Sequence, residues 1–135
     1  MSSPLIRASV DTGTDWEALA GYARAVRVGE RILVSGTTAT GPDGVVGAGD
    51  VATQARYIID KIEAAIAQLG GSLRDVVRTR VYVRNIVDWE PVAHVHGERF
   101  GNTRPANTLV QAALVGEEYL VEIEAEAVIG AGDAL

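Results

Sequence analysis

The chain has 135 residues and a formal net charge of −6, with 47% hydrophobic residues and no cysteine. This length suits a single domain over residues 1–135 that buries roughly two-thirds of its unfolded surface without cross-links. The missing cysteines exclude a disulfide framework, a thiolate nucleophile and a thiolate metal site. The acidic balance argues against nucleic acid as a partner, and no apolar run reaches the roughly 18 residues of a membrane span. With no signal-peptide pattern at the N-terminus, we expect a cytoplasmic protein without a membrane partner.

The N-terminal third predicts a strand, a loop and a β-hairpin, over residues 5–10, 11–15 and 23–35. Gly29-Glu30 is the two-residue connection of the hairpin. Ser35-Gly36 ends its second strand, and a glycine there permits the close approach of another group.

One helix follows the GPDG turn at residues 41–44. Asp50 suits its N-cap, and Gly70-Gly71 suits its C-terminal stop. Apolar residues recur between them at three- and four-residue spacing, namely Ala55, Ile58, Ile59, Ile62, Ala65, Ile66 and Leu69.

The second half predicts a strand, a helix and two further strands, over 76–84, 88–100, from 108 and from 120. Asp88 suits the N-cap of this helix and Pro91 its first turn, where a missing amide hydrogen costs nothing. The resulting fold class is α+β, with both helices able to cover one face of the sheet.

The other sheet face would carry charges of both signs. A period of two sends alternate side chains of two strands to this face, namely Glu122, Glu124, Glu126, Arg78, Arg80 and Tyr82. We expect the arginines to pair with the glutamates across strands rather than to bind phosphate. An uncovered face of mixed charge favours contact between subunits, with plain solvation as the alternative.

Glu122 is the best candidate acid or base, because a cleft on the uncovered face could desolvate it and raise its pKa. The alternative is a structural glutamate paired with Arg78 or Arg80. His94 and His96 are two residues apart, which places them about 200° apart on a helix, so we expect no metal site. Ser35 lacks the sequence context of a nucleophilic serine.

Several segments, taken together, match a known pattern: Tyr22 before a hairpin strand, Val34-Ser35-Gly36, the helix from Ala52 to Gly70, Val81-Tyr82-Val83, Arg104-Pro105-Ala106 and Val121-Glu122-Ile123-Glu124-Ala125. They resemble the Rid family (YjgF, formerly endoribonuclease L-PSP) over about residues 20–128, with the strand and loop of residues 1–19 outside the best-matching region. The resemblance implies a chorismate-mutase-like fold and a homotrimer with ligand clefts between subunits. The trimer contact would use the uncovered sheet face.

The resemblance also implies a chemistry. The best-known branch of the family hydrolyses enamines and imines derived from amino acids to keto acids and ammonia, without metal or organic cofactor. Glu122 would position or activate water, and Tyr22, Ser35 and Gly36 would line the cleft. The Pro-Ala-Arg motif that holds a substrate carboxylate in that branch reads Pro105-Ala106-Asn107 here, so a neutral amide replaces a permanently charged guanidinium.

Two functions therefore stay open. The first is a Rid-type enzyme for a small imine, enamine or related carbonyl metabolite, by hydrolytic deamination or a related hydrolysis. Glu122 would orient water, and Asn107 and Tyr22 would hold the ligand's polar end. Arg104 would either replace the missing arginine or serve as a surface ion-pair partner. The second is a non-catalytic trimer that binds a small metabolite or regulates another protein; ribonuclease activity comes last because the chain is acidic and lacks basic stacking patches.

Overall fold

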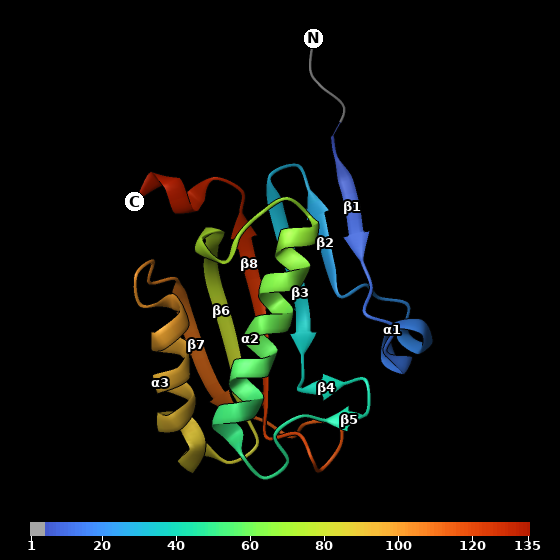
Figure 1. Ribbon diagram of the computed structural model, residues 1–135, viewed down its shortest axis with the longest axis vertical. Coiled ribbons are helices and arrows are strands. Elements are labelled where there is room, and N and C mark those ends of the chain that lie inside the picture. Colours follow the sequence, from blue (N-terminus) through green and yellow to red (C-terminus); the bar gives the residue numbers. More distant parts are fainter. Residues whose placement is uncertain (1–4) are drawn as a thin grey trace.

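A six-stranded sheet with two long helices on one face forms this fold (Figure 1). The computed structural model describes residues 5–135, so residues 1–4 of the expected N-terminal segment lie outside it. The strands are β1 (Arg7–Val10), β2 (Ala25–Val28), β3 (Arg31–Thr37), β6 (Val76–Val83), β7 (Ala106–Gln111) and β8 (Val121–Val128). They are ordered β1-β2-β3-β8-β6-β7, with β6 and β7 parallel and every other pair antiparallel. The predicted α+β class is confirmed.

Helices α2 (Val51–Gln68) and α3 (Trp89–Phe100) pack side by side on the same face of the sheet, as predicted (Figure 1). The isoleucines of α2 that recur at helical spacing are fully buried against strand residues such as Ile32 and Ile123. Each such side chain contributes about 1.5–3 kcal/mol by leaving water. Within residues 5–135 no helix is both long enough and apolar enough to cross a membrane.

The predicted ends of α2 are also confirmed. The Asp50 carboxylate accepts a hydrogen bond from the Thr53 amide at 3.1 Å. At the other end, Gly70 has a φ of +94°, its amide donates to the carbonyl of Ala67, and the Gly71 amide donates to the carbonyl of Ile66. This bonding pattern ends helices at a left-handed residue, which glycine adopts without steric cost.

Asp88 stands at the N-cap position of α3, as predicted, but its side chain does not cap the helix. Asp88 closes a 3-10 turn (Ile86–Asp88) whose own cap is Asn85, with the Asn85 side chain accepting from the Val87 amide at 3.2 Å. Asp88 has a φ of −83° and a ψ of 1°, so the chain runs from the turn into the helix and the Asp88 side chain makes no capping bond. Pro91 does lie in the first turn of α3.

A short helix and a small hairpin add to the predicted elements. Helix α1 (Asp15–Ala20) begins where the sequence predicted loop, so that loop prediction is wrong at its last residue. The hydroxyl of Thr14 caps α1 by accepting from the Glu17 amide at 3.3 Å, and Thr-x-x-Glu is a known helix-start pattern. The GPDG turn connects β4 (Thr40–Gly41) with β5 (Gly44–Val45).

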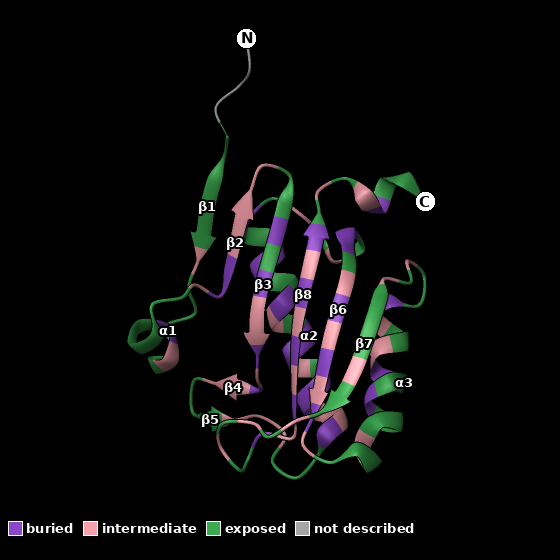
Figure 2. Cartoon of the chain, turned by 180° about the vertical axis from the view of Figure 1, so that it is seen from behind, coloured by how far each residue is buried: buried purple, intermediate pink, exposed green. Residues whose placement is uncertain are grey.

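Within the described residues 5–135, no helix covers the second sheet face, which is turned toward the viewer in Figure 2. Its registers place Arg78 opposite Glu126, Arg80 opposite Glu124 and Tyr82 opposite Glu122. An Arg80 nitrogen lies 3.5 Å from a carboxylate oxygen of Glu124 and from one of Glu126, and the Tyr82 hydroxyl donates to Glu124. Cross-strand pairing is thus confirmed for Glu124 and Glu126, whereas Glu122 has no such ion pair.

Asp75 joins two distant segments at one end of the sheet. Its buried carboxylate accepts from the Ser72 amide at 2.9 Å, the Gly130 amide at 3.2 Å and the Gly132 amide at 3.0 Å. These bonds hold the turn before β6 against the chain that follows β8.

We predict that Asp75→Ala lowers the free energy of unfolding by about 2–4 kcal/mol, because buried amide donors lose their acceptor. Urea denaturation measures the loss. Asp133→Ala is the control, since Asp133 is an exposed carboxylate of the same C-terminal segment. Equal stability changes in the two variants would contradict the assigned role of Asp75.

Candidate functional site

One cavity brings several of the predicted site residues together. It has a volume of about 250 Å³ and lies where α1, β3, α2 and β8 meet. Its lining consists of Trp16, Leu19, Ala20, Tyr22, Arg24, Gly36, Thr38, Lys61, Val115 and Glu122. We call it the Glu122 cavity.

The carboxyl group of Glu122 reaches this cavity past a bulge in β3. Val34 pairs with Ala125 and Thr37 with Ile123, so Ser35-Gly36 is looped out of regular register. A Cβ atom on Gly36 would lie 2.2 Å from Oε2 of Glu122, closer than any real contact. The glycine is therefore required for this placement, as is common where bulges adjoin functional groups.

The environment of Glu122 disfavours its charged form. Burial raises the pKa of the Glu122 carboxyl, the Arg24 guanidinium opposes that rise, and the nearby Glu124 charge adds to it. Among residues 5–135, the Glu122 carboxyl has neither a hydrogen bond nor an ion pair. A half-buried, unpaired carboxyl with a raised pKa is suited to accept a proton from water near neutral pH.

The side chain of Arg24 holds the bulge of β3 in place. This side chain is 3% exposed, and one terminal nitrogen donates to the Gly36 carbonyl at 2.6 Å and to the Thr37 hydroxyl at 3.0 Å. The other donates to a Glu17 carboxylate oxygen at 3.3 Å, while the guanidinium lies 5.6 Å from the ring centre of Tyr22. One cation thus contacts the bulge of β3, the ring of Tyr22 and α1.

Glu17 supplies the counter-charge for that cation. Burial acts to raise the pKa of its carboxyl, but the Thr12 hydroxyl and amide, the Thr14 hydroxyl and Arg24 outweigh this and lower the pKa to about 2. The Thr12 amide donates at 2.8 Å, and the Thr12 and Thr14 hydroxyls donate at 2.6 and 2.8 Å. These bonds fix α1 as one wall of the Glu122 cavity.

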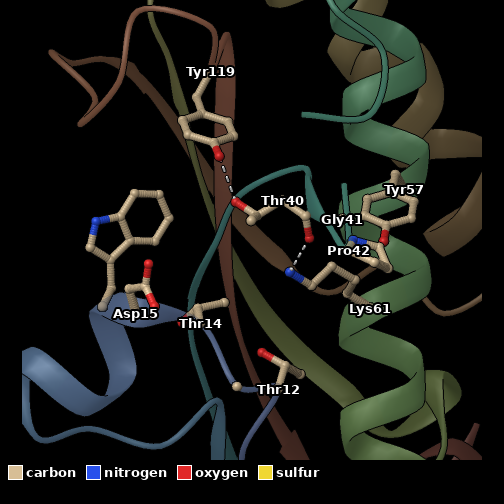
Figure 3. A pocket seen from close by; sticks show the side chains of 11 residues that line it. Thr12, Thr14, Asp15, Thr40, Gly41, Pro42, Tyr57, Lys61 and Tyr119 are labelled. Atoms are coloured by element: carbon tan, nitrogen blue, oxygen red, sulfur yellow. Dashed lines mark hydrogen bonds between the residues drawn. The ribbon is translucent and has the colours of Figure 1, made fainter. Parts of the chain in front are cut away.

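Lys61 of α2 places its amine at the boundary with a second cavity (Figure 3). Its Nζ atom donates to the carbonyl oxygens of Thr38 at 3.4 Å and Thr40 at 3.0 Å. Burial lowers the pKa of the Lys61 amine, the Arg24 charge lowers it further, and the Glu17 charge acts the other way. The second cavity has a volume of about 680 Å³, and its wall includes hydroxyl groups of threonines and tyrosines.

Three predicted site residues lie outside the Glu122 cavity of a single chain. The Ser35 hydroxyl donates to the Ala23 carbonyl at 2.7 Å, which latches β3 to the chain before β2. The Asn107 side chain donates to the Thr79 hydroxyl at 2.9 Å from β7, the last strand of the sheet. Arg104 is exposed in the loop before β7, with a φ of +53°. Tyr22, Gly36 and Glu122 are the predicted residues that the fold brings together.

The two histidines occupy different surroundings. His94 is exposed, with Nε2 at 3.9 Å from a Glu90 oxygen, whereas His96 is half-buried and shares a 2.7 Å hydrogen bond with the Thr79 hydroxyl. The ring of His96 also packs against Phe100. In the described part of the chain, no three histidine, aspartate or glutamate side chains are placed to hold a metal ion.

Sequence reasoning missed Trp16, Arg24 and Lys61. Lys61 did leave a signal, because it is a charged residue within the apolar spacing of α2, three residues after Ile58 and four before Ala65. The Thr-x-x-Glu pattern could have revealed α1 and with it Trp16. Arg24 has no local signal, since its partners come from segments 7 to 13 residues away.

Comparisons with known proteins identify relatives of this chain. The family described as Endoribonuclease L-PSP matches residues 12–129. The chain is 38% identical over 135 residues to an uncharacterized protein of Streptomyces coelicolor, covering 99% of this chain and 100% of that protein. It is 34% identical over 106 residues to the 3-aminoacrylate deaminase RutC of Acinetobacter baylyi, covering 78% and 84%. A crystal structure of a Mycobacterium tuberculosis member of the YjgF/YER057c/UK114 family aligns with a TM-score of 0.83 at 42% identity, covering 92% of this chain and 100% of that one.

We predict that Glu17→Gln lowers the free energy of unfolding by about 3 kcal/mol at pH 7, because the carboxyl has a folded pKa of about 2 against an ordinary 4.5. A lowered folded pKa stabilises the fold above pH 4.5, and this stabilisation is lost as the pH falls toward 2. The difference between wild type and variant should therefore shrink across that window. Urea titrations at pH 7 and pH 3 measure it, with Glu30→Gln as an exposed control. A difference that does not change with pH would show that the Glu17 charge is not what stabilises the fold.

Proposed function

This chain belongs to the endoribonuclease L-PSP family, also called the Rid or YjgF family, and we propose that it hydrolyses a small imine or enamine to a carbonyl compound and ammonia. The observation that carries the proposal is the unpaired, half-buried Glu122 carboxyl at the Gly36 bulge. The relative named as a 3-aminoacrylate deaminase supports the substrate class, because 3-aminoacrylate is an enamine that bears a carboxylate.

The proposed reaction begins with the imine form of the substrate in the Glu122 cavity. The Glu122 carboxylate takes a proton from water while the water oxygen bonds to the imine carbon, and it passes this proton to the nitrogen to give a carbinolamine. The hydroxyl proton then passes through Glu122 to the nitrogen, the carbon–nitrogen bond breaks, and ammonia and a carbonyl compound leave. Burial assists both steps, since it makes the carboxylate a stronger base and keeps bulk water away.

We propose that the complete cleft forms between copies of the chain in a homotrimer. The uncovered sheet face is suited to this contact, because it presents exposed Leu33, Val110 and Val128 beside the charged ladder of Arg80 and Glu124. Asn107 and Arg104 belong to the free edge of the sheet, where a neighbouring copy could receive them. A trimer of this kind would bring them to the Glu122 cavity of another copy. A non-catalytic metabolite-binding trimer is the alternative, and the neutral Asn107 favours it.

We predict that Glu122→Gln reduces ammonia release from 3-aminoacrylate at least about 100-fold, because the amide cannot accept the proton of water. In the wild type, kcat/KM should fall with decreasing pH through a value above 4.5, since the base form is lost below the raised pKa. Glu63→Gln, at an exposed carboxylate of α2, should keep full activity. Undiminished ammonia release by Glu122→Gln would refute the assigned role.

We predict that Asn107→Arg raises kcat/KM for 3-aminoacrylate about tenfold, because a guanidinium adds a charge-assisted contact to the substrate carboxylate. Asn107→Gln is the control, being neutral and able to hydrogen-bond. Ammonia release measures both, and sedimentation verifies that the assembly is unchanged. An unchanged rate in an intact assembly would favour the binding protein over the enzyme.

A further inference from the structure

Lys61 differs from every other basic residue of the chain. It is the single lysine among the 12 Lys and Arg residues of the chain, and the others are arginines. It stands half-buried in the middle of α2, between the Glu122 cavity and the second cavity, and lines both. Lysine differs from arginine in one chemical respect that matters here: its amine can lose a proton and act as a nucleophile.

The contacts of Lys61 suit a neutral amine. A neutral amine has two N–H bonds and one lone pair, and Nζ has two acceptors, the carbonyl oxygens of Thr38 and Thr40. If a neutral amine directs both hydrogens to these carbonyls, its lone pair has no other described hydrogen-bond partner. An ion pair would stabilise the ammonium form, but Lys61 forms none among residues 5–135.

The charged groups around Lys61 come from three segments, namely α1, the chain before β2, and β8. Arg24 raises the cost of a second positive charge, and its effect adds to that of burial. Glu17 acts in the opposite direction, but its carboxylate is already bonded to Arg24. Glu122 lines the same cavity as Lys61, and Asp15 lines the second cavity from the exposed start of α1.

We propose that Lys61 is a nucleophilic catalytic residue whose amine forms an imine with small carbonyl compounds. Its place in catalysis rests on the hydrolysis proposed above, whereas imine formation with a carbonyl compound does not. Lys61 and Glu122 line one cavity of about 250 Å³ with apolar walls from Trp16, Leu19 and Val115.

The covalent steps balance without any further reactant. The Lys61 lone pair attacks the imine carbon of the substrate, both Nζ protons pass in turn to the substrate nitrogen, and ammonia leaves. The substrate carbon is then bound to Lys61 through a carbon–nitrogen double bond. Water adds to this carbon, Glu122 passes both protons of the water in turn to Nζ, the bond to Nζ breaks, and the carbonyl product leaves with the Lys61 amine restored. The protein-bound imine is more readily protonated than a carbonyl and is therefore more reactive toward water.

Reductive trapping tests the proposal. Intact protein is incubated with pyruvate and sodium cyanoborohydride at pH 7, and the reduced adduct is located by peptide mass spectrometry. A single lysine makes the readout unambiguous, and the N-terminal α-amine is an internal reference. An ordinary lysine, with a pKa near 10.4, would react far more slowly than an α-amine with a pKa near 8. We expect the Lys61 peptide to be labelled at least as fast as the N-terminal peptide.

Two variants separate this proposal from the proposed function. Lys61→Arg keeps a long basic side chain but cannot form an imine, so it should lose the internal adduct and at least about tenfold in ammonia release; its melting temperature verifies the fold. Glu122→Gln should keep the Lys61 adduct while steady-state ammonia release is lost. Trapping at Lys61 without any measurable hydrolysis would uphold the nucleophile and refute the deaminase. Labelling of the N-terminal amine alone, or full ammonia release by a folded Lys61→Arg, would overturn the proposal.

Discussion

The site depends on one buried cation, the guanidinium of Arg24. A buried charge is tolerated only when it is paired and hydrogen-bonded, and Arg24 meets this requirement with Glu17, the Gly36 carbonyl and the Thr37 hydroxyl. Satisfying it forces α1 against the end of the sheet and fixes the bulge of β3. Two walls of the Glu122 cavity therefore follow from the pairing of one charge. The Nε atom of Arg24 is buried without a partner, so this arrangement still carries an uncompensated polar group.

The same cation connects the two titratable groups of the cavity. Burial disfavours charge on both Glu122 and Lys61, which raises one pKa and lowers the other. Arg24 strengthens the effect on Lys61 and opposes it on Glu122. Two groups whose pKa values are shifted toward each other can exchange and hold protons near neutral pH. The cavity is therefore suited to acid–base chemistry.

In a single chain, the Glu122 cavity is separated from the free edge of the sheet at β7. Asn107 belongs to β7, and β6 separates β7 from the strand that carries Glu122. The proposed function therefore depends on assembly more than on the fold of one chain. The uncovered sheet face has apolar side chains around paired charges, which is a composition that a subunit contact can bury.

The sequence by itself determined the elements whose patterns are local. Apolar spacing located α2, Asp50 and Gly70 located its ends, and alternation located the strands of the charged ladder. Local reasoning located Asp88 at the start of α3 but missed the preceding 3-10 turn, which leaves the Asp88 side chain without a capping bond. It also missed α1, whose helix-start pattern was overlooked. Glu122 was predicted to be a cleft residue because the period of two along its strand and the family resemblance both indicated it.

Only the tertiary structure decided which residues surround Glu122. Arg24, Gly36 and Lys61 come from three segments, and nothing in the periodicity of any one segment refers to the others. Burial, pKa and hydrogen bonding depend on neighbours in space, so the opposed shifts of Glu122 and Lys61 exist only after the chain has folded. Such neighbours result from packing between distant segments. The periodicity and capping patterns of the sequence, by contrast, indicate only the local backbone structure.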